Sequence, residues 1–213
     1  MPCQMPCQMP CAKDLSLYDH VSDGYDKSHS RWLRFEGGEA QCAFEGAATA
    51  LLRPGMRALD VACGTGTVAR RLLKEASGNA EIVLLDTSPR MLAKCADIPA
   101  HRVKGCMTHL PFEADTFDLL TCAWGIETLV DPRPALAEFL RVTRLGGHIC
   151  LVFCSDRPVR SLVGRALRHR ITSTGKGRFL DHEMLHDQAL QTGARRVQRL
   201  HCTGPAAAMI IHV

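Results

Sequence analysis

Hydrophobic residues in the middle of the chain follow two patterns in turn. Mainly apolar runs predict strands at residues 58–62, 81–85, 117–123 and 148–153, with a shorter strand at 102–107. The run at 117–123 is typical of a strand buried on both faces. Apolar residues spaced as on one face of a helix cover 67–76, 89–97, 132–144, 158–171 and 181–192. Strands that alternate with helices predict a parallel sheet.

Two final strands are predicted at 195–202 and 207–213. The connection between them is too short for a parallel crossover, so one of the two must run antiparallel. The pattern therefore predicts an α/β fold: a Rossmann-like, doubly wound, seven-stranded and mostly parallel sheet. One antiparallel strand lies near the C-terminus, and helices cover both faces.

The N-terminal part of the chain has a different character. Residues 14–52 are predicted to be helical, and Gly37-Gly38 is expected to divide them into an entry segment and a second helix. Before them the repeat Met-Pro-Cys-Gln places a proline at every fourth position, which forbids a regular helix. We interpret residues 1–13 as a disordered leader and 14–213 as one domain; the alternative for the leader is a thiol-rich metal or redox tail.

Composition narrows the class of protein. A chain of 213 residues with 46% hydrophobic and 23% charged residues fits one globular domain. The net charge of +4 gives no argument for a nucleic-acid partner, and the apolar runs fall well below the roughly 20 residues of a membrane span. No secretory signal is visible, so a cytoplasmic location is the expectation. The eleven cysteines form no C-x-x-C pair, so neither a zinc ribbon nor a thioredoxin-like site is indicated.

The turn between the first strand and its helix carries the most informative chemistry. Gly64, Gly66 and Ala69 satisfy the dinucleotide fingerprint G-x-G-x-x-A. Asp60, four residues before Gly64, would place negative charge near two phosphates. The same carboxylate favours the ammonium and sulfonium of S-adenosylmethionine, which has no phosphate. The sequence therefore favours S-adenosylmethionine over NAD.

Four stretches together carry a family resemblance: residues 59–66, 86–92, 110–119 and 141–147. In this order and spacing the chain resembles the class I S-adenosylmethionine-dependent methyltransferases, in the branch of the ubiquinone/menaquinone-biosynthesis C-methyltransferases. The resemblance covers about residues 55–155. It implies methyl transfer to a small-molecule or lipid-like acceptor, either quinol-type or an amine lipid. It also implies that residues 14–52 form a helical lid and that 155–180 are an acceptor-side insertion.

The resemblance also implies cofactor contacts. Asp60 would bind the ammonium, the backbone of 62–66 the methionyl part, and Asp86 the ribose hydroxyls. Cys106 and Met107 stand where the family usually has an acid and a small residue for the adenine. The expected cofactor-binding residues are Asp60, Ala62, Gly64, Gly66, Asp86, Thr87, Met91, Cys106, Met107 and Tyr25. For Tyr25, with Tyr18 and Trp32, the alternative is plain helix packing.

Trp124 and Glu127 follow the strand at 117–123, at the crevice where open α/β sheets bind ligands. We expect both to contact the acceptor and Glu127 to act as a base if the acceptor needs one. The alternative is a core aromatic residue beside a surface acid. Because the residues here depart from the family pattern, the alternative is a protein that binds the cofactor but has no methyltransferase activity.

Two further motifs allow other functions. His182, Glu183 and His186 match H-E-x-x-H, in which two histidines one helical turn apart could bind zinc with Glu183 as the base. Charged and polar residues follow the second histidine, which argues against a zinc hydrolase. The stretch 158–171 is basic and amphipathic, and is either a solvated surface helix or a contact with an anionic membrane.

Overall fold

The computed structural model describes residues 18–20, 22–75, 79–159, 161–175 and 177–213. The predicted leader at 1–13 lies outside the described residues. The strands are β1 (Arg57–Val61), β2 (Glu81–Asp86), β3 (His101–Lys104), β4 (Phe117–Ala123), β5 (Thr143–Cys154), β6 (Arg196–His201) and β7 (Ala206–His212). The helices are α2 (Tyr25–Trp32), α3 (Gly38–Leu51), α4 (Thr67–Glu75), α5 (Pro89–Ala93), α6 (Arg133–Val142), α7 (Leu162–Ser173) and α8 (His182–Thr192).

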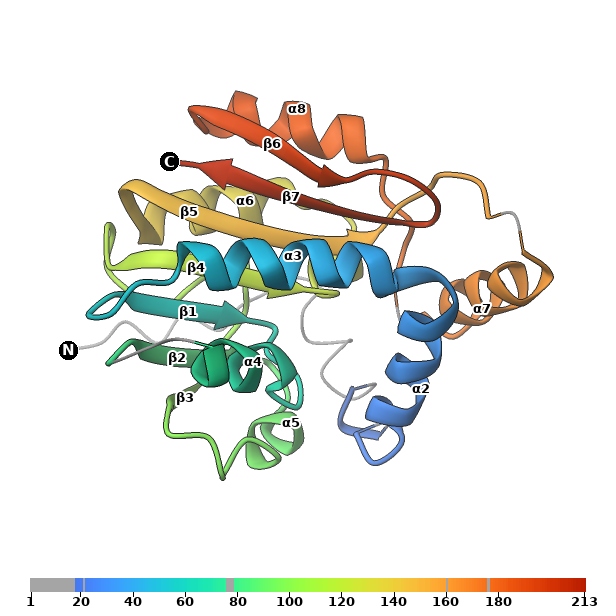
Figure 1. Ribbon diagram of the computed structural model, residues 1–213, viewed down its shortest axis with the longest axis horizontal. Helices are drawn as coiled ribbons and strands as arrows, with labels where there is room; N and C mark the ends of the chain where they lie inside the picture. Colours follow the sequence, from blue (N-terminus) through green and yellow to red (C-terminus); the bar gives the residue numbers. More distant parts are fainter. Residues whose placement is uncertain (1–17, 21, 76–78, 160, 176) are drawn as a thin grey trace.

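The strands form one seven-stranded sheet in the order β3-β2-β1-β4-β5-β7-β6. β7 pairs antiparallel with both of its neighbours, and the other named strands run parallel to one another. Figure 1 shows α3 and α4 on one face of the sheet and α6 and α8 on the other. The predicted fold, with its single antiparallel strand near the C-terminus, is confirmed.

The predicted break at Gly37-Gly38 is wrong. A π-helix, η1 (Leu33–Gly37), joins α2 to α3, so the helical backbone continues while the axis bends (Figure 1). Gly37 permits the bend because a Cβ at this position would lie 2.6 Å from Nε1 of Trp32 and 2.9 Å from Cη2 of Trp124. The glycine is therefore a packing requirement and does not end the helix.

Several boundaries also differ from the prediction. α6 ends at Val142, and β5 begins at Thr143 and runs through Gly146-Gly147, which were expected to end the helix. α7 begins at Leu162, where Ser161 accepts the backbone N–H of Gly164 and caps the helix. α5 is only five residues long, and turns occupy most of the remaining predicted helix up to 97.

Candidate active site

The candidate site lies where strand order reverses, between the carboxyl ends of β1 and β4. Ala62 and Trp124, the residues that follow these strands, have left-handed backbone conformations, with φ of 54° and 55°. Non-glycine residues rarely adopt this region, and such strain is concentrated at functional sites. The reversal point is also where open α/β sheets form a crevice for ligands.

Asp60 is a buried carboxyl group on β1. Its Oδ1 accepts a hydrogen bond of 2.8 Å from the hydroxyl of Thr121, while Oδ2 has no partner among the described residues. Burial raises the pKa of Asp60 to about 7. Asp60 is 1% exposed, so the contact with the ammonium of S-adenosylmethionine that the resemblance implies stays a prediction.

Asp86, at the end of β2, joins the glycine turn to the start of α5. Its Oδ2 accepts the N–H of Gly64 at 2.8 Å, and its Oδ1 accepts the N–H of Ser88 at 2.9 Å. Burial raises the pKa of Asp86. Each carboxylate oxygen can accept more than one hydrogen bond, so the group can still accept from ribose hydroxyls.

The two glycines of the turn have different tasks. Gly64 has φ of +54°, and a Cβ there would meet only the ring of Tyr25 at 3.9 Å, so its backbone faces open space. Gly66 has φ of +79°, but a Cβ there would lie 2.3 Å from Cδ1 of Ile98. Gly66 therefore serves the packing of the turn, while Gly64 leaves room for a ligand.

A cavity of about 60 Å³ opens beside Gly64 and Asp86. Seven of the ten predicted cofactor-binding residues line it: Ala62, Gly64, Asp86, Thr87, Met91, Met107 and Tyr25. Asp60, Gly66 and Cys106 are not among its lining residues. Gly125, Thr128 and Leu129 also line the cavity but were not predicted from the sequence. Their closeness in sequence to Trp124, which was predicted to lie at the site, is the signal that could have identified them.

The segment before and within α2 lies over this cavity. Asp26 accepts a 2.7 Å hydrogen bond from the hydroxyl of Thr65 in the glycine turn. The hydroxyl of Ser88 donates to Asp19, and Lys94 pairs with Asp23 at 3.2 Å. These contacts hold Tyr25 at the wall of the cavity.

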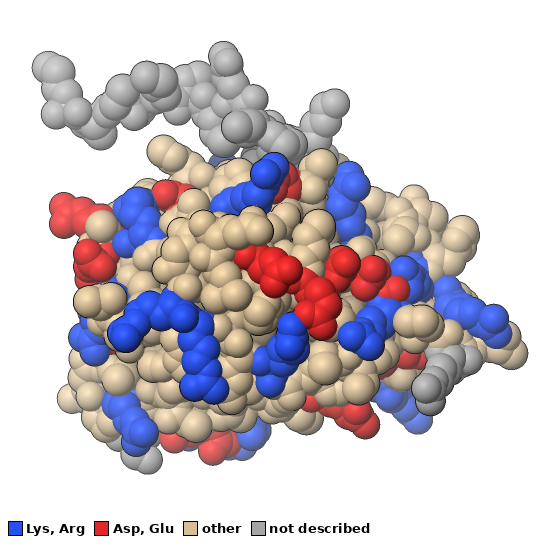
Figure 2. Space-filling model, turned by 90° about the horizontal axis from the view of Figure 1, so that it is seen from above, with Lys and Arg blue, Asp and Glu red and all other residues tan. Residues whose placement is uncertain are grey.

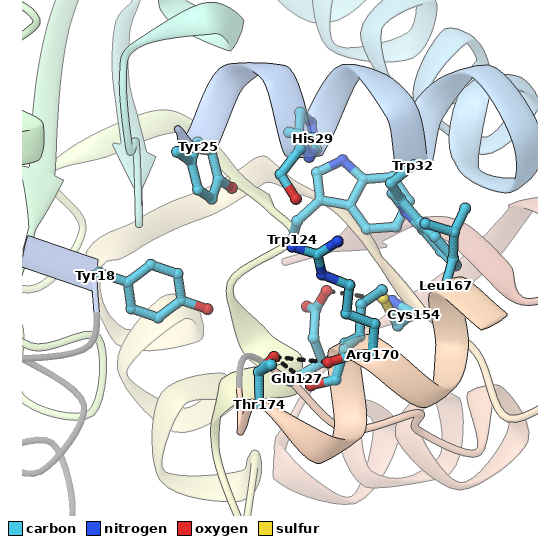
Figure 3. Close-up of a pocket in the computed structure, with 13 residues that line it drawn as sticks. Tyr18, Tyr25, His29, Trp32, Trp124, Glu127, Cys154, Leu167, Arg170 and Thr174 are labelled. Carbon is cyan, nitrogen blue, oxygen red and sulfur yellow. Dashed lines mark hydrogen bonds between the residues drawn. The ribbon is translucent and has the colours of Figure 1, made fainter. Parts of the chain in front are cut away.

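A second cavity, of about 100 Å³, adjoins the first and shares Tyr18, Tyr25 and Trp124 with it (Figure 3). Its walls are aromatic: Tyr25 stacks on His29 at 5.6 Å between ring centroids, and the Trp124 ring lies 5.9 Å from those of His29 and Trp32. Nε1 of Trp124 donates to Gln41 at 2.6 Å, which fixes the indole orientation.

Glu127 supplies a carboxyl group to this second cavity. It lies in the short helix η2 (Ile126–Thr128), and only 3% of its surface is exposed. Oε1 accepts the N–H of Cys154 at 3.3 Å, whereas Oε2 has no partner among the described residues. Burial raises the pKa of Glu127 to about 7 and lowers that of His29 to about 4. His29 and Glu127 therefore line the same cavity, with the histidine uncharged at neutral pH.

The H-E-x-x-H stretch does not assemble as a zinc site. His182 is buried and its Nε2 lies 3.1 Å from the guanidinium of Arg157. Glu183 is ion-paired with Arg199, and His186 contacts Asp187 at 3.0 Å. Within the part of the chain that the structure describes, the group able to hold a metal near His182 is completed by Asp156 and Asp181, without His186.

Comparison with known proteins decides the family. The methyltransferase domain family matches residues 59–151. A demethylmenaquinone methyltransferase of Clavibacter sepedonicus is 34% identical over 151 residues, which is 68% of this chain and 59% of that protein. Residues 59–151 of this chain therefore belong to the methyltransferase domain family.

Other relatives agree with this assignment. A ubiquinone/menaquinone biosynthesis C-methyltransferase of a Ruegeria species is 37% identical over 50% of this chain and 45% of its own length. The chain therefore spans about half the length of the curated relatives that it matches. The crystal structure of a methyltransferase from Thermotoga maritima superposes with a TM-score of 0.67 at 21% identity, covering 90% of this chain and 98% of that one, and shows the shared fold. The family's methyl donor is S-adenosylmethionine, as Asp60 led us to expect in place of NAD.

Proposed function

We propose that this protein transfers a methyl group from S-adenosylmethionine to a small-molecule acceptor of the quinol type. One observation carries the proposal: two adjoining cavities share Tyr18, Tyr25 and Trp124, and the buried residue Glu127 lines the second. The relatives are named for methyl transfer in menaquinone and ubiquinone synthesis, and these names support a quinol as the acceptor.

In this proposal the first cavity binds the cofactor. Gly64 leaves room for the methionyl part and Asp86 accepts the ribose hydroxyls. Asp60 does not line the cavity, and its negative charge on β1 would attract the ammonium without a direct contact. Thr87, Met91 and Met107 pack against the remainder, and Tyr25 closes the cavity. Gly66 shapes the turn and Cys106 lies beside Met107. The bound cofactor supplies a methyl carbon already activated by its sulfonium, so the protein's main task is to align the acceptor and exclude water.

The second cavity binds the acceptor. The indole of Trp124 offers a flat apolar surface, and a quinol hydroxyl would donate its hydrogen bond to Oε2 of Glu127. A carboxyl group with a pKa near 7 can accept that proton at neutral pH. Glu127 is therefore our candidate for the general base.

Binding of S-adenosylhomocysteine, measured by calorimetry, tests the cofactor site. We expect the wild type to bind and Asp86→Ala to bind at least about tenfold more weakly, because the Asp86 carboxylate holds the glycine turn and faces the ribose. The matched control is Asp187→Ala, an exposed acid on α8. No binding by the wild type, or equal affinity in Asp86→Ala, would refute the assignment.

The wider assignments belong to the same proposal. We propose a lid role for residues 14–52, supported by the contacts of Asp26 and Asp19 across the cofactor cavity. We propose an acceptor-side role for 155–180, supported by Leu167 and Ile171 in the second cavity. We place the protein in the cytoplasm, with no nucleic-acid partner and with peripheral membrane contact through 158–171. No described helix is long and apolar enough to cross a bilayer.

A further inference from the structure

Large apolar side chains are exposed where η1 meets the start of α7. Leu162 is 76% exposed, and Phe35 and Val163 are each 47% exposed. Four other large apolar side chains are exposed among the described residues, two of them less than Phe35 and Val163, and none of the four belongs to η1 or α7. We call Phe35, Leu162 and Val163, with Arg34 and Arg165, the α7 rim.

The two elements of the α7 rim form one continuous surface. The hydroxyl of Ser161 donates to Oε1 of Glu36 at 2.6 Å, and a Cβ on Gly164 would overlap the Glu36 carboxylate. The single acid of η1 is therefore engaged with the N-terminal end of α7. This contact joins Phe35 and Arg34 to Leu162 and Val163.

The charge of the α7 rim is positive. α7 contains three arginines and no acidic residue. Arg168 is used within the protein, since it donates to the backbone of Asp156 and packs over the ring of Phe179 at 4.5 Å. Arg165 and Arg34 remain exposed. In Figure 2, basic side chains gather at the right-hand end of the molecule, the end where α7 lies in Figure 1.

The opposite side of α7 faces the acceptor cavity. Leu167, Arg170 and Ile171 line that cavity, whereas Leu162 and Val163 point to solvent. The apolar stripe expected on one face of 158–171 is thus divided between the cavity and the surface. α7 separates the solvent at the α7 rim from the proposed acceptor site.

We propose that the α7 rim docks on an anionic lipid bilayer and that the acceptor passes from the bilayer beside α7 into the second cavity. Exposed apolar side chains next to arginines suit the boundary between lipid headgroups and acyl chains. A purely polar partner such as nucleic acid would leave Leu162 and Phe35 without a role. The passage of the acceptor rests on the proposed function; the docking does not.

Co-sedimentation with vesicles tests the docking. We expect the wild type to sediment with vesicles of phosphatidylcholine and about 30% phosphatidylglycerol at low salt, and to be released at about 0.5 M salt because exposed charges are then screened. Leu162→Ser and Arg165→Glu are each expected to lower the bound fraction at least threefold.

Leu145→Ser and Arg195→Glu are the matched controls. Leu145 is 75% exposed near the opposite end of β5, and Arg195 is an exposed arginine beside β6. Both controls should bind like the wild type. Equal binding by all variants, equal binding to pure phosphatidylcholine, or binding to duplex DNA in place of vesicles would overturn the proposal. Calorimetry with S-adenosylhomocysteine on the same variants distinguishes failure of membrane docking from failure of the cofactor site. None of the substituted residues lines the cofactor cavity, so all variants should bind S-adenosylhomocysteine like the wild type.

Discussion

At the scale of single residues, two buried carboxyl groups define the site and oppose its stability. Asp60 and Glu127 each have one oxygen without a partner among the described residues, and burial raises both pKa values to about 7. A group whose folded-state pKa lies above its unfolded value lowers stability as pH rises between the two values. Each carboxyl group therefore destabilises the unliganded protein at neutral pH and above.

Asp60→Asn should separate stability from function. The amide can still accept from Thr121 but carries no charge. At pH 8 we expect the melting temperature of the variant to exceed that of the wild type by roughly 5 °C, and near pH 4 to match it. Scanning calorimetry at both pH values measures this. S-adenosylhomocysteine should bind the variant more weakly. A variant less stable than the wild type at pH 8 would contradict the explanation.

Glu127→Gln should change the pH dependence of the reaction. If Glu127 accepts the acceptor's proton, wild-type kcat rises with pH through about 7 as the carboxyl group ionises. The glutamine variant should be about 100-fold slower and should lack this rise. The assay follows methyl transfer to a naphthoquinol from pH 5.5 to 8.5. Glu113→Gln, an exposed acid, is the control, and an unchanged profile in Glu127→Gln would exclude the base role.

At the scale of elements, the π-helix η1 sets the position of the aromatic wall. Gly37 lies against the indoles of Trp32 and Trp124, so the bend between α2 and α3 brings helix backbone directly onto both rings. The shape of the second cavity thus depends on a residue that does not line it.

Gly37→Ala and Gly46→Ala form a matched pair for testing this role of η1. The added methyl group at Gly37 would displace both indoles, so we expect a loss of about 1–3 kcal/mol in stability and weaker acceptor binding. A Cβ at Gly46 meets nothing within 4 Å on α3, so that variant should gain about 0.5–1 kcal/mol. Urea unfolding followed by tryptophan fluorescence measures both changes. Equal effects of the two substitutions would exclude the packing role of Gly37.

The sequence was sufficient where local pattern decides the structure. β4 occupies the predicted 117–123, because an apolar run between turn signals is a strong signal of a buried strand. It was insufficient where distant residues decide it. Gly37 packs against two tryptophans, one of them far along the chain, and apolar spacing alone did not separate the exposed Leu162 from Leu167, which lines a cavity.

Some residues of the candidate site could also be placed from local sequence, whereas others could not. Asp86 could be placed from its position after β2, and it lines the cofactor cavity as expected. Gly125 and Leu129 were signalled only by their closeness in sequence to Trp124, which itself has a left-handed backbone conformation. That conformation is set by tertiary packing and leaves no mark in the spacing of apolar residues.

At the scale of the whole molecule, the N-terminal segment connects parts far apart in sequence. Asp19, Asp23 and Asp26 contact Ser88, Lys94 and Thr65 respectively, and so hold α2 across the cofactor cavity. These few polar contacts are partly exposed, so the segment should open more easily than the sheet.

Limited trypsin digestion should detect this opening. We expect cleavage after Lys27 or Arg31 to slow at least fivefold when S-adenosylhomocysteine is bound, because the ligand contacts the closed segment and favours it. Cleavage after Arg165 on α7 serves as the control. Mass spectrometry of the fragments measures both rates. Equal protection at both places would indicate general stabilisation without closure of the segment.

The position of β7 has a consequence for how the sheet is built. β6 leaves the ribosome before β7, yet among the described strands its one partner is β7, which lies between β6 and β5. β6 must therefore wait, with its backbone hydrogen bonds unmade, until the next strand has been synthesised. Its polar side chains, exposed at Arg196, Gln198 and Arg199, suit a strand that spends this interval in water. Synthesis order thus prevents β6 from joining the sheet until β7 has emerged.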